Sequence, residues 1–159
     1  MSYRAAVITV SDRASAGVYE DKSGPALCAM LREAGYEIAH TAIVPDEQEC
    51  ISDVLIRCAD EEGIDLILTT GGTGLSPRDV TPEATRAVLE REIPAIAQAM
   101  LFYSLSITPH AMLSRAAAGT RGGSLIVNLP GSEKGARENL TAILGALGHG
   151  LRMLGGEGH

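Results

Sequence analysis

The sequence predicts an α/β fold, a three-layer sandwich in which a largely parallel central sheet is covered by helices on both faces. Short apolar runs alternate along the chain with longer segments whose apolar residues recur at helical spacing. Most of these short runs lack the polar alternation of a half-exposed sheet, which is typical of strands buried on both faces. No internal repeat or low-complexity linker divides the 159 residues. We therefore expect a single domain, residues 1–159.

The first half of the chain predicts two strands and two helices. Residues 5–10 are nearly all apolar and form the first strand, and the segment after it is expected to be a loop. Residues 23–34 carry one apolar stripe at helical spacing and are followed by a glycine that ends the helix. Residues 36–44 alternate as a second strand, which Pro45 stops. Residues 47–62 form a helix with acidic residues on its outer face.

The second half continues the alternation. The apolar run 64–70 predicts a third strand, and residues 81–92 predict a helix that the following Ile-Pro pair breaks. Residues 94–105 form a further helix with an apolar stripe. The small residues 116–119 favour a helix by propensity alone. Residues 124–129 form a buried strand that ends at a Pro-Gly pair.

The last helix is expected to begin at Ser132, whose hydroxyl can cap it. Its inner stripe carries apolar residues at helical spacing: Ala136, Leu140, Ile143, Leu144 and Leu147. Residues 155–159 are mostly glycine, with little to pack, and we expect them to be a frayed tail.

Composition excludes several classes of protein. The formal net charge of −7 disfavours nucleic-acid binding, because phosphate neutralisation requires a basic face. The first apolar run is too short for a signal peptide or a membrane helix, so no membrane partner is expected. Cys28, Cys50 and Cys58 are widely spaced without C-x-x-C, which favours reduced thiols in a cytoplasmic protein. The four histidines lack a zinc-ligand spacing such as H-E-x-x-H.

The stretch around Thr-Thr-Gly-Gly-Thr-Gly organises the rest of the chain. Gly71, Gly72 and Gly74 remove side chains, so a ligand can approach the main-chain N–H groups closely. Thr81, followed by proline, predicts a helix start at which the threonine oxygen caps free N–H groups. Asp79 lies in the loop just before that helix. A carboxylate beside an anion cradle repels the ligand unless a cation lies between them, so the pair suggests Mg²⁺.

The common phosphate-binding motifs do not match this loop. The P-loop pattern requires a lysine that the loop lacks, and a G-x-G-x-x-G pattern begun at Gly72 would place its third glycine at Pro77. Taken alone, Gly-Gly-Thr-Gly is equally explained by an ordinary strand-to-helix loop whose glycines only permit tight turning.

Several segments together resemble the molybdopterin-binding family of molybdenum-cofactor biosynthesis, and most closely its molybdopterin adenylyltransferases. The matching segments cover nearly the whole chain: residues 70–74 and 77–85, with 9–13, 20–25, 44–46, 114–119 and 128–132. The resemblance implies an extended segment at residues 116–119, against the helical propensity there. It also implies a homotrimer.

The resemblance names a reaction. It implies Mg²⁺-dependent transfer of AMP from ATP to the terminal phosphate of molybdopterin, which gives adenylylated molybdopterin and pyrophosphate. Such a nucleotidyl transfer depends on alignment and charge compensation and requires no protein nucleophile. Hand-over of the product to a metal-inserting molybdotransferase is a further expectation. The alternative is a non-catalytic molybdopterin-binding or scaffold module of the same fold.

The resemblance also suggests roles for individual residues. We expect Asp79 to hold Mg²⁺ on the reacting phosphates, with Asp46 as a second catalytic and metal-binding carboxylate. Substrate binding is assigned to the glycine loop and to residues at strand ends: Gly71, Gly72, Thr73, Gly74, Ser11, Asp12, Arg13, Ser114, Arg115, Pro130, Gly131 and Ser132. Without the family, Asp46 fits equally as a helix cap and Ser11 and Asp12 as turn residues. Arg78 fits either a phosphate clamp or a structural partner of Asp79.

Overall fold

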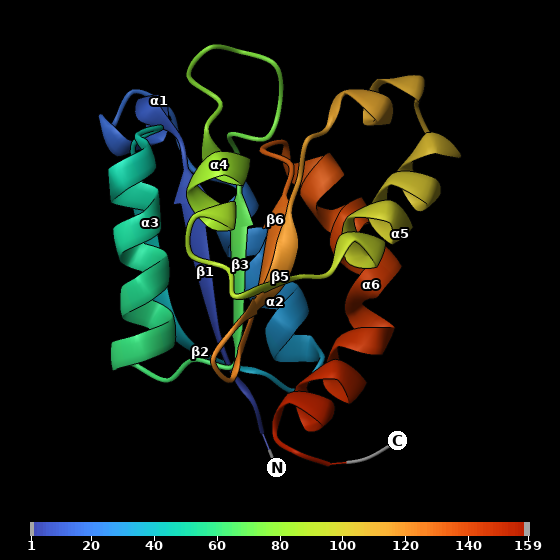
Figure 1. Cartoon of the computed structure of the whole chain (residues 1–159). Coiled ribbons are helices and arrows are strands. Elements are labelled where there is room, and N and C mark those ends of the chain that lie inside the picture. Colours follow the sequence, from blue (N-terminus) through green and yellow to red (C-terminus); the bar gives the residue numbers. More distant parts are fainter. Residues whose placement is uncertain (1, 158–159) are drawn as a thin grey trace.

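Figure 1 shows the computed structural model of the chain, which describes residues 2–157. Strands and helices alternate over most of its length. In chain order the elements are β1 (Arg4–Val10), α1 (Asp12–Ser15), α2 (Ser23–Glu33), β2 (Glu37–Val44), α3 (Gln48–Ile56), the π-helical turn η1 (Arg57–Glu61), β3 (Leu66–Thr70), α4 (Thr81–Arg86), β4 (Arg91–Glu92), α5 (Pro94–Leu105), the 3₁₀ turn η2 (Pro109–Leu113), β5 (Ala118–Arg121), β6 (Ser124–Leu129) and α6 (Glu133–Leu154).

The strands form one six-stranded sheet in the order β2-β1-β3-β6-β5-β4. β1 pairs in parallel with both β2 and β3, and β3 pairs in parallel with β6. The last two strands are antiparallel, β5 to β6 and β4 to β5. The predicted α/β class with a largely parallel sheet is therefore confirmed.

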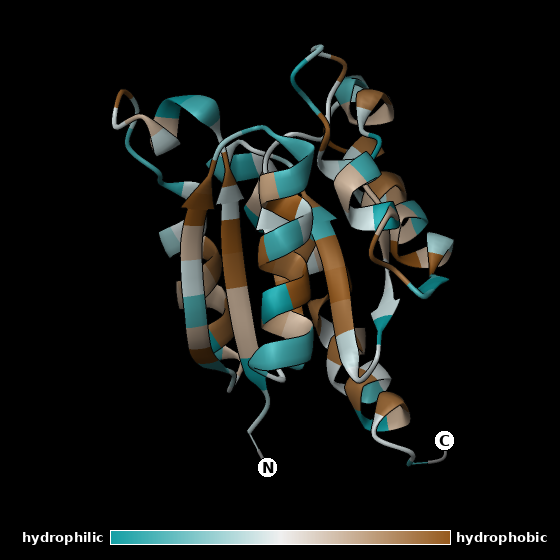
Figure 2. Cartoon of the chain, turned by 60° about the vertical axis from the view of Figure 1, so that its left-hand side comes forward, coloured by the Kyte–Doolittle hydropathy of each residue, from teal (hydrophilic) through white to brown (hydrophobic). Residues whose placement is uncertain are grey.

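Helices cover both faces of the sheet (Figure 1). Alternate residues of β1 enter two separate cores, because successive side chains of a strand point to opposite faces. Ala5 and Val7 pack in the core shared with α2 and α6, whereas Ala6 and Ile8 pack in the core shared with α3 and α4. Figure 2, in which α3 comes forward, shows hydrophilic colours on the outer side of this helix and hydrophobic colours along the strands behind it. Among residues 2–157 no helix is long and apolar enough to cross a membrane.

A buried amide joins the centre of the sheet to α4. The Asn128 side-chain nitrogen donates hydrogen bonds of 2.9 Å to the hydroxyls of Thr69 and Thr85. Its carbonyl oxygen accepts a 3.0 Å bond from the Ala117 N–H. Because a buried polar group is costly unless it is hydrogen-bonded, this network fixes α4 and the loop before it relative to β3 and β6.

The helix expected at residues 81–92 is shorter than the sequence predicts. α4 ends at Arg86, and β4 pairs with β5 through Arg91 and Thr120. The Glu90 N–H donates to the Thr120 carbonyl at 2.8 Å. Pairing with a distant strand therefore overrides the local helical pattern, as tertiary contacts often do.

Two smaller segments also differ from local expectation. The segment after β1, expected to be a loop, contains the short helix α1, whose N-cap Ser11 accepts a hydrogen bond from the Ala14 N–H. The small-residue run continues into strand β5, so the extended segment implied by the resemblance is confirmed and the helical propensity is not realised. At the carboxyl end, Gly155 and Glu157 hydrogen bond back to α6, and residues 158–159 of the expected frayed tail lie outside the described residues.

Substitutions in α6 test which side of this helix supports the fold. We predict that Leu140→Ala lowers the free energy of unfolding by about 2–5 kcal/mol, because Leu140 is fully buried and its removal leaves a cavity. Met153→Ala in the same helix removes an exposed side chain, so it should change stability by less than about 0.5 kcal/mol. Urea denaturation measures both. Equal losses in the two variants would contradict this packing.

Candidate functional site

The glycine loop that follows β3 is held by close backbone contacts. Gly71 and Gly72 have φ angles of 108° and 70°, a left-handed region that favours glycine. A Cβ atom on Gly71 would collide with the Val10 carbonyl oxygen, and one on Gly72 would collide with the Thr81 hydroxyl. The Gly71 N–H donates to the Leu129 carbonyl at 3.0 Å. Glycine is therefore required here because the loop passes directly over the ends of β1 and β6.

Arg115 supports the far side of this loop. Its guanidinium donates to the carbonyls of Gly74 and Asp79 at 2.8 and 2.6 Å and to the carboxylate of Glu83 at 2.6 Å. Its backbone N–H also donates to the Thr73 carbonyl. The hydrogen bonds from Arg115 hold the pKa of Glu83 below its ordinary value. The sequence predicts that Arg115 lines the substrate site. Its contacts instead join the two arms of the loop, Thr73 and Gly74 on one arm and Asp79 and Glu83 on the other.

A polar hollow of about 230 Å³ opens beside the glycines, at the carboxyl ends of β1 and β3. Ligands of open α/β sheets gather at this edge. The lining includes three carboxylates, from Asp21, Asp46 and Asp79. The other lining residues are Tyr19 and residues with small side chains or none: Thr9, Val10, Ser11, Ala14, Ser23, Thr70, Gly71, Gly72 and Gly131.

Asp46 is held by reciprocal bonds with Asp12. Its carboxylate accepts a 2.8 Å bond from the Asp12 N–H, and its own N–H donates to the Asp12 carboxylate at 2.9 Å. Asp46 therefore does not cap α3, whose N-cap is Glu47 and which has no side-chain cap bond. Burial raises the pKa of Asp46 above its ordinary value, and the negative charges of Asp12 and Asp79 act in the same direction. The hollow is thus lined by carboxylates, with no arginine or lysine among its described lining residues to offset their charge.

Arg78 pairs with Asp12. Its Nε and Nη2 atoms donate to the two carboxylate oxygens of Asp12 at 2.9 and 3.0 Å. These hydrogen bonds lower the pKa of Asp12. The alternative in which Arg78 is the structural partner of Asp79 is wrong. Asp79 instead accepts a hydrogen bond from the Ser76 N–H at 3.0 Å.

Thr81 leaves a buried oxygen unsatisfied at the base of the loop. The sequence predicts that Thr81 caps α4, but this is wrong, because Val80 is the N-cap and Thr81 is the first helical residue. Among the described residues, the Thr81 hydroxyl is buried without a hydrogen-bond partner and lies against Gly72. Such a group is costly to bury unless something bonds to it.

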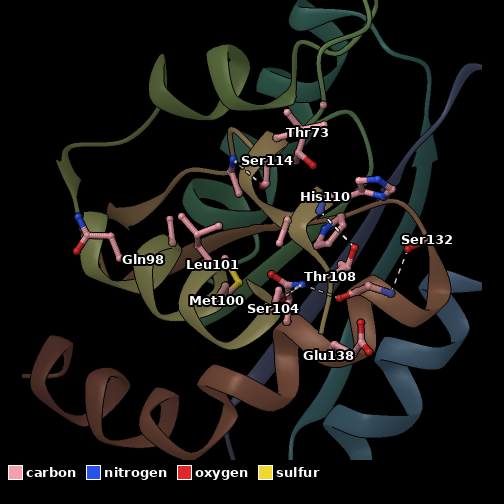
Figure 3. Close-up of a pocket in the computed structure, with 18 residues that line it drawn as sticks. Thr73, Gln98, Met100, Leu101, Ser104, Thr108, His110, Ser114, Ser132 and Glu138 are labelled. Carbon is pink, nitrogen blue, oxygen red and sulfur yellow. Dashed lines mark hydrogen bonds between the residues drawn. The ribbon is translucent and has the colours of Figure 1, made fainter. Parts of the chain in front are cut away.

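A second, mainly apolar hollow of about 410 Å³ lies on the other side of the glycine loop. Figure 3 shows Gln98, Met100, Leu101 and Ser104 of α5 on one side and Glu138 of α6 on another. Ser104 accepts a 3.0 Å hydrogen bond from the Asn139 amide. The remaining lining residues come from the loop, from α5, from η2 and the residues on either side of it, and from α6 and the residues before it: Thr73, Gly74, Ala97, Thr108, His110, Ala111, Leu113, Ser114, Ala116, Pro130, Ser132, Gly135 and Asn139.

The structure divides the predicted site residues into three groups. Those that line the polar hollow are Ser11, Asp46, Gly71, Gly72, Asp79 and Gly131. Those that line the apolar hollow are Thr73, Gly74, Ser114, Pro130 and Ser132. Asp12, Arg13 and Arg115 line neither hollow. The exposed Arg13 places its guanidinium over the Tyr19 ring, 5.4 Å from the centroid.

The sequence prediction missed several residues at the two hollows. Asp21 accepts hydrogen bonds from the Thr9 hydroxyl at 2.7 Å and from the Gly24 N–H at 3.0 Å, while lining the polar hollow. Asp21 lies within residues 20–25, one of the segments that resemble the family, and this position could have identified it. The α5 wall of the apolar hollow carried no such signal, because its residues have the spacing of an ordinary core helix.

Comparisons with known proteins agree over most of the chain. Residues 6–149 match the family described as a probable molybdopterin binding domain. The chain is 48% identical to a molybdopterin adenylyltransferase of Haemophilus influenzae over 139 residues, 86% of this chain and 71% of the relative. It is 45% identical to that of Helicobacter pylori over 153 residues, 95% of this chain and 87% of the relative. Among solved structures it is similar to the molybdopterin biosynthesis enzyme MoaB of Thermus thermophilus, with 50% identity, a TM-score of 0.93 and 98% of both chains covered.

A glycine substitution tests the loop geometry. We predict that Gly71→Ala lowers the free energy of unfolding by at least about 1–2 kcal/mol, because its φ is left-handed and the new Cβ meets the Val10 carbonyl. Gly123→Ala is the matched control, since a Cβ there meets nothing within 4 Å. Chemical denaturation of both variants gives the comparison. A Gly71→Ala variant as stable as the control would show that the close contact is not required.

Proposed function

This chain belongs to the molybdopterin-binding family of molybdenum-cofactor biosynthesis, and we propose how its two hollows carry out the reaction of that pathway. It acts as a molybdopterin adenylyltransferase and uses molybdopterin and ATP as substrates. AMP passes from ATP to the terminal phosphate of molybdopterin, and pyrophosphate leaves. The observation that supports our assignment is that Asp46 and Asp79 lie beside the glycine-rich loop in one polar hollow.

The polar hollow is the site that we assign to the reacting phosphates. The main-chain N–H groups of Gly72, Thr73 and Gly74 would face phosphate oxygens, because the glycines leave the backbone open to a ligand. The Gly71 N–H, which the sequence assigned to the same role, is already bonded to the Leu129 carbonyl. The terminal phosphate of molybdopterin is already an anion, so no residue has to remove a proton from it. The task of the loop is to align the two phosphates and to exclude water.

The residues of this hollow fit Mg²⁺. Carboxylate oxygens are ligands that Mg²⁺ prefers, and Asp46 beside Gly72 and Asp79 beside Gly74 supply them. The buried Thr81 hydroxyl lies against Gly72, outside the lining of this hollow, and still requires a partner. Arg78 is already paired with Asp12 and offsets the charge of Asp46 only in part. Mg²⁺ held by Asp79 and Asp46 would neutralise charge on the phosphates during transfer.

The apolar hollow suits a flat heterocycle, and both substrates carry one, the pterin and the adenine. Its volume of about 410 Å³ lies within the range of about 300–1,000 Å³ found for small-molecule sites. Ser114, Ser132 and His110 place polar groups at its edge (Figure 3). Thr73 and Gly74 line this hollow, whereas Gly71 and Gly72 line the polar one. A substrate whose ring lies in the apolar hollow can therefore extend across the loop and place its phosphate in the polar hollow.

An exposed apolar surface supports the homotrimer. Large apolar side chains of α5 and the segment after it are exposed: Phe102 by 84%, Met112 by 62%, Leu113 by 49%, Leu105 and Ile107 by 42% and Tyr103 by 39%. We call this set the α5 surface. Contiguous apolar area on this scale marks a protein contact. We therefore assign the α5 surface to contacts between copies of this chain.

The three free cysteines support a cytoplasmic location.

The proposed metal role is tested at Asp79. We predict that Asp79→Asn abolishes Mg²⁺-dependent release of pyrophosphate, because the amide cannot replace the negative ligand. Circular dichroism and the affinity for molybdopterin should change little, since the fold and the second hollow stay intact. The control is Asp53→Asn, which alters an exposed carboxylate on α3 away from both hollows. Unchanged turnover in Asp79→Asn would defeat the assignment.

The same assay separates catalysis from a binding-only module. Pyrophosphate should be released only when ATP, molybdopterin and Mg²⁺ are all present. A scaffold of the same fold would bind molybdopterin and release none. Hand-over of the adenylylated product to a metal-inserting molybdotransferase is the next step that we expect.

The trimer is tested at the α5 surface. We predict that Phe102→Asp shifts the protein from trimer to monomer, because three buried aspartates at one interface would be strongly unfavourable. Light scattering coupled to size-exclusion chromatography measures the mass. Met153→Asp adds the same charge at an exposed position of α6, outside the α5 surface, and should leave the trimer intact. A wild-type monomer, or a trimer that survives Phe102→Asp, would contradict the assignment.

A further inference from the structure

Three potential metal ligands meet at the edge of the sheet, on β2 and η1. They are the imidazole of His40, the thiol of Cys58 and the carboxylate of Glu62, and their ligand atoms all lie within 4.8 Å of one another. His40 Nδ1 lies 3.2 Å from the Glu62 carboxylate. We propose that His40, Cys58 and Glu62 form a binding site for Zn²⁺, separate from the two hollows.

An irregularity in β2 directs His40 toward this cluster. Ile38 and His40 are two residues apart, so in a regular strand they would point to the same face. The register with β1 shifts between them, because Ala5 pairs with Ile38 whereas Ala6 pairs with His40. Ile38 therefore packs against the core of α2 and α6, while Ala6, the partner of His40, belongs to the core of α3. The bulge thus turns His40 to the face that α3 and η1 cover.

A second irregularity presents the other two ligands. The helix that begins as α3 widens into the π-helical turn η1, in which the Glu62 N–H donates to the Arg57 carbonyl at 3.0 Å. Cys58 and Glu62 are four residues apart and project from the same side of this turn. π-turns occur at helix C-termini, which is where η1 lies. Two departures from regular structure thus bring ligands to one point.

The ligand set suits zinc in particular. Zn²⁺ binds thiolate, imidazole and carboxylate with bonds of about 2.0–2.3 Å, and three protein ligands leave a fourth position for water or another ligand. Small side-chain rotations close the three groups on one ion. The side chains of His40 and Glu62 are 24% and 29% exposed, whereas Cys58 is fully buried beneath them. An ion can therefore reach the thiol from the solvent side of the cluster.

Binding must displace the thiol proton. Burial raises the pKa of Cys58 to about 11, with the Glu62 charge acting in the same direction. The thiol is therefore protonated at neutral pH until a metal replaces the proton, as in other thiolate sites. The competing explanation is an ordinary ion pair of His40 and Glu62 above a core cysteine. An ion pair alone does not explain why the bulge in β2 and the π-turn both bring side chains to the Cys58 thiol.

The experiment uses Co²⁺ and Zn²⁺ as the probes and the full chain without an affinity tag. Co²⁺ added to the metal-free protein should give a near-ultraviolet thiolate-to-cobalt charge-transfer band and the visible bands of a tetrahedral ion. Both should be lost in Cys58→Ser. Cys50→Ser is the matched control, because Cys50 lies on α3, which continues into η1, but outside the cluster, and it should keep the bands.

Zn²⁺ affinity, measured by competition with a chromophoric chelator, provides the second readout. One equivalent should bind, and affinity should fall by more than about tenfold in His40→Gln and Glu62→Gln. These half-exposed positions keep the test valid even if Cys58→Ser does not fold. Bands that persist in Cys58→Ser, or Zn²⁺ binding that is equally tight in His40→Gln and the wild type, would overturn the proposal.

Discussion

The site depends on the contact between Gly71 and the last carbonyl group of β1. That contact brings the loop after β3 directly over the end of the neighbouring strand, where no Cβ atom fits. Because β1, β2, β3 and β6 run in parallel, the residues that follow them meet at the same edge of the sheet. The loop lies at the centre of this edge and separates a polar hollow from an apolar one. We propose that this one glycine-rich segment contacts both ends of a substrate that has a ring and a phosphate.

The distribution of arginines explains why the polar hollow stays negatively charged. Arg78 and Arg115 both come from segments that resemble the family, yet among the described residues neither forms an ion pair with the carboxylates of Asp46 and Asp79. Arg78 binds Asp12, and Arg115 binds loop carbonyls and Glu83. Both guanidinium groups therefore shape the loop, and burial and the neighbouring acids still raise the pKa of Asp46. We propose that a bound cation compensates the charge of Asp46 and Asp79, so that a nucleotide binds together with its metal ion.

Most of the fold could be predicted because its signals are local. The buried strands 5–10 and 124–129 are short apolar runs, and the N-cap Ser132 and the first-turn Pro94 mark helix starts directly. The end of α4 could not be predicted, since it depends on a hydrogen bond between Glu90 and Thr120, which lie far apart in the sequence. For the site, the glycines and both aspartates followed from a motif. The bracing role of Arg115 and the α5 wall did not, because both depend on how distant elements pack.

The most direct test is a crystal structure of the protein with a non-hydrolysable ATP analogue and Mn²⁺, whose anomalous scattering locates the ion. We predict one ion at about 2.0–2.2 Å from oxygens of Asp79 and Asp46, with phosphate oxygens facing the N–H groups of Gly72, Thr73 and Gly74. An ion bound by neither aspartate, or phosphates placed away from these glycines, would contradict it.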